Sequence, residues 1–109
     1  MNWIELTNIK QIDSLSSELK ASLIFKHSTR CSISSMALSR LEGSWDNSKT
    51  PIKVYYLDLI AHRDISAYIA EKFNVHHQSP QILLIKNGEC TYEETHMGIR
   101  YAEIIEQIG

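Results

Sequence analysis

Cys31 is the residue with the clearest chemical potential, because it stands where an apolar segment gives way to residues with helical spacing. The thiolate is the nucleophilic form of cysteine, and a helix N-terminus or neighbouring cations favour it. Lys26, His27 and Arg30 precede Cys31 and can add positive charge. The sequence therefore predicts a nucleophilic, redox-active thiol, against the simpler alternative of an inert buried cysteine.

The spacing Cys-x-x-Ser around this thiol lacks the second cysteine of a dithiol motif. Ser34 stands at that second position, where its hydroxyl can donate to the Cys31 thiolate or cap the helix, and the sequence leaves both roles open. With no local partner, a mixed disulfide on Cys31 must be released by an external thiol. Cys90 follows an Asn-Gly turn, so we expect it at the far end of the sheet in a structural role.

The histidines do not form a recognisable metal motif. The five histidines are His27, His62, His76, His77 and His96. None of them makes a His-x-x-x-His pair and no cysteine stands at a typical ligand spacing, so the sequence predicts no metal site. His77 and His96 fall in segments that we expect beside Cys31, where they either tune the thiolate or stabilise loops.

Composition indicates a globular protein without nucleic-acid or membrane partners. The 109 residues are 43% hydrophobic and 22% charged, which is typical of one domain, predicted here over residues 1–109. A formal net charge of −2 disfavours nucleic-acid binding. The first residues lack a secretory leader, and the apolar runs are far shorter than the ~20 residues of a membrane helix, so we expect a cytoplasmic protein with reduced thiols.

Hydrophobic periodicity predicts alternating helices and strands. Asp64 is the expected N-cap of the third helix, Gly43 the expected end of the second, and Asn87-Gly88 the turn of a hairpin. The segment 3–6 is a weaker candidate for a further short strand. The expected helices are 9–19, 33–41, 65–73 and 101–108, and the expected strands are 21–25, 52–57, 82–86 and 89–94.

This order predicts an α/β protein with a thioredoxin-like fold, in which helices flank a central mixed sheet of four or five strands. Strands separated by helices pair in parallel, and the hairpin adds an antiparallel edge. Ser79 and Pro80, before the third long strand, match the loop whose proline is typically cis and faces the active cysteine in such folds. The backbone of Ser79 would pair with an extended substrate chain, unless the segment is an ordinary turn.

The chain resembles the monothiol bacilliredoxins, a family of thioredoxin-fold proteins of the bacillithiol system. The residues that carry the resemblance are Phe25-Lys26-His27-Ser28-Thr29, Cys31-x-Ile33-Ser34, Asp58, Arg63, Ser66, Val75-x-His77-x-Ser79-Pro80-Gln81 and His96. They span nearly the whole chain. Proline commonly follows the cysteine in this family, and Ser32 stands there instead, offering an N–H and a hydroxyl near the sulfur.

The resemblance implies a thiol–disulfide oxidoreductase that removes bacillithiol from protein mixed disulfides. Cys31 and Ser34 would be the catalytic residues, bacillithiol the co-substrate, and no cofactor would be bound. Lys26, Arg30 and Arg63 could bind the carboxylates of bacillithiol, and a ligand could approach the backbone at Gly98. The implied substrate-binding residues are Lys26, His27, Arg30, Ser32, Ser79, Pro80, His96 and Gly98.

The implied partners are bacillithiolated proteins and a low-molecular-weight thiol. Two other classes of function remain open at this point. One is a module that binds a thiol or shares an iron–sulfur cluster, as monothiol glutaredoxins do, although their Cys-Gly-Phe-Ser pattern is missing. The other is an adaptor that has kept the fold and lost catalysis.

Overall fold

The computed structural model describes residues 1–108 and contains one five-stranded sheet, with strand order β1-β3-β2-β4-β5. The strands are β1 (Trp3–Glu5), β2 (Ser22–His27), β3 (Lys53–Asp58), β4 (Gln81–Lys86) and β5 (Glu89–Thr95). The helices are α1 (Ile9–Ser16), α2 (Ser32–Ser44), α3 (Arg63–Lys72) and α4 (Tyr101–Ile108), with a 3₁₀ turn at His96–Gly98. The predicted mixed sheet is confirmed, and the segment near residue 3 is its fifth strand.

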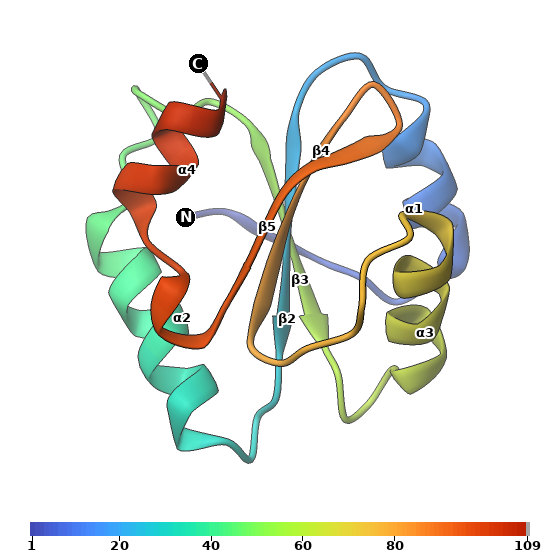
Figure 1. Ribbon diagram of the computed structural model, residues 1–109, viewed down its shortest axis with the longest axis horizontal. Coiled ribbons are helices and arrows are strands. Elements are labelled where there is room, and N and C mark those ends of the chain that lie inside the picture. The colour runs from blue at the N-terminus through green and yellow to red at the C-terminus, as the bar shows by residue number, and fades with distance from the viewer. Residues whose placement is uncertain (109) are drawn as a thin grey trace.

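Helices cover both faces of the sheet, α1 and α3 on one side and α2 and α4 on the other (Figure 1). Because side chains alternate along β2, Ile24 packs into the core under α1 and α3, whereas Leu23 and Phe25 pack under α2 and α4. None of the helices in the described part of the chain is long and apolar enough to cross a membrane.

Strand directions decide which ends of the sheet meet. β2 is parallel to β3 and antiparallel to β4, with Lys26 opposite Gln81 and Ser22 opposite Ile85. The carboxyl end of β2, which leads to Cys31, therefore lies beside the amino end of β4, which follows Pro80. Cys90 pairs with Ile85 at the other end of β4, as expected for a residue just after the hairpin turn.

Several predicted boundaries were wrong. α1 ends at Ser16 rather than near residue 19, and the Leu19 side chain is 79% exposed. α2 continues past Gly43 to Ser44, and His62 rather than Asp64 is the N-cap of α3, which leaves Asp64 in the first turn. β2 runs two residues beyond the predicted strand, to His27, which brings two polar residues into the interior.

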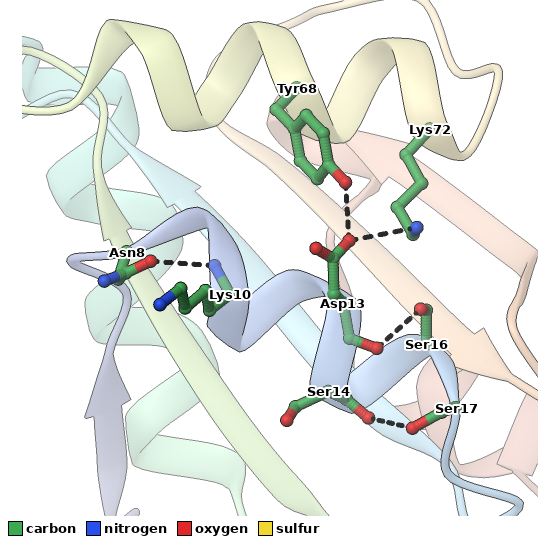
Figure 2. Close-up of polar contacts among 8 residues, drawn as sticks. All are labelled: Asn8, Lys10, Asp13, Ser14, Ser16, Ser17, Tyr68 and Lys72. Carbon is green, nitrogen blue, oxygen red and sulfur yellow. Dashed lines mark hydrogen bonds and ion pairs between the residues drawn. The ribbon is translucent and has the colours of Figure 1, made fainter.

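Side chains at the surface join α1 to α3, the helix that carries part of the candidate site. Asp13 on α1 accepts a hydrogen bond from the Tyr68 hydroxyl and lies 3.1 Å from the Lys72 ammonium, both on α3 (Figure 2). These two contacts hold the pKa of the Asp13 carboxyl below its usual range. At the start of α1, Asn8 accepts from the backbone N–H of Lys10 and forms a capping box.

Candidate active site

Cys31 is the N-cap residue of α2 and is partly exposed. Its backbone N–H donates to the Ser28 carbonyl at 3.1 Å, and its carbonyl accepts from Ser35 at 3.1 Å in the first turn of the helix. The residue thus stands at the helix N-terminus, where the partial positive charge of the helix and its free backbone N–H groups are concentrated. This placement agrees with the strand–cysteine–helix arrangement that the sequence predicted.

Ser34 does not hold the Cys31 sulfur, contrary to one of its two predicted roles. Its hydroxyl is buried, accepts the Ser28 N–H at 3.1 Å, and lies 2.7 Å from Nδ1 of His27. Cys31, not Ser34, is the N-cap, and no hydrogen bond within residues 1–108 joins the two side chains. Ser34 instead ties the start of α2 to the end of β2.

His27 was predicted to add positive charge and to bind substrate, and the structure corrects both expectations. The ring is 5% exposed and packs beside Phe25 and Tyr56, with centroid distances of 6.1 and 5.6 Å. Burial lowers its pKa, outweighing the opposite effects of Asp58 and Glu42. His27 is therefore neutral near pH 7 and is a buried structural partner of Ser34.

Lys26 is also buried, although the sequence predicted a direct carboxylate ligand. Its side chain is fully covered, and its Nζ lies 3.3 Å from both the Ser66 carbonyl and His77 Nδ1. Burial lowers its pKa to about 8. The ammonium has only uncharged hydrogen-bond partners in the described chain, so it cannot touch a substrate directly in this conformation.

His77 connects this buried ammonium to the surface. Its Nδ1 lies 3.3 Å from Lys26 Nζ and 3.2 Å from the Ser66 hydroxyl, while the residue as a whole is exposed. Burial of the ring atoms and the charges of Lys26 and His76 lower the pKa of His77. Because the Lys26 ammonium can only donate, Nδ1 accepts, and the proton of the neutral ring is on Nε2.

A pocket of about 470 Å³ is lined in part by Ser66 and His77, the two hydrogen-bond partners of Lys26. It is lined by Ser28, Arg30, Leu59, Ile60, Arg63, Ser66, Ala67 and His77. Arg30 precedes Cys31 directly, so the pocket begins beside the loop that carries the thiol. The structure therefore brings together Arg30 and Arg63, two of the residues predicted to bind carboxylates. Lys26, the third, does not line the pocket but lies buried against Ser66 and His77.

The Ser79–Pro80 peptide bond is cis, as expected for the thioredoxin-like loop. Gln81 lies opposite Lys26, so Pro80, the residue before Gln81, stands at the carboxyl end of β2. Its carbonyl accepts the His96 N–H at 3.2 Å, which joins this loop to the segment after β5. The Ser79 hydroxyl is buried and has no hydrogen-bond partner among the described residues.

The other predicted contact residues have different surroundings. Ser32 is exposed in the first turn of α2. Arg40 donates to the His96 carbonyl at 3.3 Å and fixes the backbone there. In this conformation the carboxylate end of Glu94 lies where a side chain on Gly98 would stand, so Glu94 covers the glycine at which a ligand was expected.

Ser66 was named from the sequence only as part of the family resemblance, with no role of its own, and His77 was left with two alternative roles. Ser66 stands on the inner face of α3 among apolar residues, and this polar residue at a core position was the available signal. Within residues 1–108, no cluster of three or more His, Cys, Asp or Glu side chains could hold a metal ion.

A cysteine at a helix N-terminus, with a cis-proline at the adjacent strand end of a mixed sheet, defines the class of thioredoxin-fold thiol oxidoreductases. The family model of the monothiol bacilliredoxin BrxC matches residues 4–104, so the chain belongs to that family.

Solved structures support the same class. One, described as having a thioredoxin fold and a candidate oxidoreductase role, is 32% identical with a TM-score of 0.85, and the match covers 97% of this chain and 93% of that one. Thioredoxin from Plasmodium falciparum is 16% identical, with a TM-score of 0.73 and coverage of 96% and 98%. Thioredoxin from Trypanosoma brucei brucei is 15% identical, with a TM-score of 0.72 and coverage of 98% and 88%. These two share the fold.

Proposed function

We propose that the protein removes bacillithiol from protein mixed disulfides by a one-thiol mechanism at Cys31, in the cytoplasm. The observation that carries this proposal is a partly exposed cysteine at the N-terminus of α2, with Ser34 where a dithiol enzyme has its second cysteine. Membership of the monothiol bacilliredoxin family supports bacillithiol as the co-substrate.

The reaction consists of two thiol–disulfide exchanges. In the first, the Cys31 thiolate attacks the bacillithiol sulfur of the mixed disulfide, the old S–S bond breaks, and the substrate protein leaves as a thiolate that takes up a proton. In the second, a free bacillithiol thiolate attacks the bacillithiol sulfur held on Cys31. Bacillithiol disulfide forms, and the Cys31 thiolate is regenerated.

Exposed apolar side chains around the thiol support the docking of a protein substrate. Ile33 and Met36, on the first turns of α2, are 50% and 63% exposed, and Met97 after β5 is 68% exposed. Contiguous apolar patches on a protein surface commonly mark sites at which another protein binds. The backbone of Ser79, beside Pro80, would pair with the extended substrate chain.

The test is to incubate the purified protein with a bacillithiolated protein and to follow both partners by intact mass. We expect the bacillithiol adduct to move to Cys31. Cys31→Ala should abolish the transfer, whereas the matched variant Cys90→Ala should keep it, because Cys90 lies at the other end of the sheet. If the substrate keeps its bacillithiol in the presence of the wild-type protein, the proposed function is wrong.

A further inference from the structure

The pocket beside the Cys31 loop gathers positive charge. Arg30 and Arg63 line it, and the Lys26 ammonium lies behind Ser66 and His77, which form part of its wall. No acidic residue lines the pocket, and within residues 1–108 none of these three cations takes part in an ion pair. Such a concentration of one charge sign favours an anion.

Lys26 is an independent sign of a ligand, because a buried ammonium without a carboxylate partner destabilises a folded protein. Within residues 1–108 the Lys26 ammonium forms no ion pair, and burial lowers its pKa. Asp58, on the neighbouring strand, accepts instead from the backbone N–H groups of Ile60 and Ala61. A hydrophobic residue of similar size at position 26 would be less costly, so the charge is best explained by binding.

We propose that this pocket binds the carboxylate groups of a small thiol, with Arg30 and Arg63 holding them directly and Lys26 supplying charge from behind the wall. That the carboxylates belong to a thiol rests on the proposed function, in which the sulfur of that thiol is joined to Cys31 during the transfer. The position of Arg30, directly before Cys31, suits a ligand anchored on both the sulfur and the pocket.

Ser66 and His77 transmit the effect of Lys26 to the pocket. The Lys26 ammonium donates to Nδ1 of His77, so the Nε2–H of the ring is free to donate to a ligand. The Ser66 hydroxyl, 3.2 Å from the same Nδ1, is a second polar group of the wall. Lys26 is therefore a positioning residue that also contributes long-range attraction, and the two arginines make the contacts.

The first experiment titrates the ¹⁵N-labelled protein with L-malate, a small dicarboxylate without sulfur. We expect saturable shifts of the Ser28, Ser66 and Ala67 amides, and an affinity about tenfold lower in Arg63→Gln and in Lys26→Met, as for loss of one charge interaction. Arg100→Gln is the matched control, because Arg100 is exposed and outside the pocket. Absence of saturable shifts, or equal affinity in all variants, would overturn the proposal.

The second readout distinguishes a functional Lys26 from a structural one. At pH 8 the Lys26 amine is about half protonated, so a bound anion should draw protons into the protein. Calorimetry with malate in two buffers of different ionisation enthalpy measures this uptake. Arg30, Arg63 and His77 also line the pocket, and the charge of His76 acts on His77, so the decisive quantity is the difference in proton uptake between wild type and Lys26→Met. Equal uptake by both proteins would refute the role of Lys26.

Two further experiments identify the source of the carboxylates and test the anion site independently of the proposed reaction. A tetraglutamate peptide that binds as tightly as malate would overturn the small-thiol source and favour acidic side chains of a substrate protein. Malate binding without any bacillithiol transfer would support the anion site and contradict the proposed function. If Arg63→Gln and Lys26→Met transfer bacillithiol as the wild type does, and malate does not bind to the wild type, the proposed reaction would be supported and the anion site would be refuted.

Discussion

Two consecutive residues at the end of β2, Lys26 and His27, are buried on opposite faces of the sheet and have opposite consequences. His27 is directed to the α2 side, where Ser34 and aromatic rings enclose it. Lys26 is directed to the α3 side, where its partners Ser66 and His77 line an open pocket.

The difference shows that burial of a polar group has no single meaning. A neutral ring with a good hydrogen-bond partner joins a strand to a helix at little electrostatic cost. A charged amine in the same strand, with only neutral partners, costs stability unless a ligand compensates for it. We therefore assign the His27 side to holding Cys31 in place, and the Lys26 side to binding.

The largest expected effect concerns the charge of Lys26 and is seen in the pH dependence of stability. Its pKa is about 8 in the folded protein and 10.5 in an unperturbed lysine, so the unfolded chain binds more protons between these values. The contribution of Lys26 to the free energy of unfolding should therefore rise with pH from about 8 to 10.5, by up to about 3 kcal/mol.

Urea unfolding at several pH values checks this, with wild type compared to Lys26→Met so that other titrating groups cancel. We expect Lys26→Met to be the more stable protein at pH 7, and the gap to narrow as the pH rises. A gap that is constant with pH would mean that Lys26 carries no unfavourable charge, and the contrast between the two faces would disappear.

The next effect belongs to the other face. Ser34→Ala removes the buried partner of the Ser28 N–H and of His27, and should lower the free energy of unfolding by about 1–3 kcal/mol. Ser35→Ala, one residue further along α2 and exposed, is the matched control and should change little. Malate binding should survive in Ser34→Ala, and its loss would show that the two faces are not independent.

The smallest effect is expected at the surface bridge between α1 and α3. Asp13→Asn weakens the contacts of residue 13 with Tyr68 and Lys72, which are exposed to solvent (Figure 2). We expect a loss of stability smaller than that of Ser34→Ala, and one that shrinks further as salt is added. A loss that salt does not change would show that this bridge works by packing rather than by charge.

Much of the fold was predictable from the sequence because local signals agreed with it. The Asn87-Gly88 turn is present, with φ values of 55° and 78°, and Gly88 approaches the Ser16 carbonyl so closely that a side chain would not fit. The position of Cys31 at the start of a helix also followed from hydrophobic spacing. The hairpin turn and the start of the helix are both set by neighbouring residues in the chain.

The parts that failed depend on contacts between distant residues. The sequence predicted that β2 ends before Lys26 and His27, because polar residues after an apolar run usually end a buried strand. Their hydrogen bonds to Ser66 and Ser34 inside the protein depend on residues far from them or on a different element. Leu19 continued the helical spacing of α1, yet the helix ends earlier and leaves it in solvent. For Ser34, capping and thiolate binding were both plausible locally, and tertiary packing selected a third role.

The placement of the two cysteines has a consequence for how the protein would work over time. Cys31 follows the carboxyl end of β2, while Cys90 pairs with Ile85, opposite the amino end of that strand. With the length of the strand between them, they cannot close an internal disulfide. The molecule thus keeps no oxidising equivalent of its own. In the proposed reaction its turnover would follow the concentration of free thiol around it, so that each molecule stays loaded for longer as that pool is depleted.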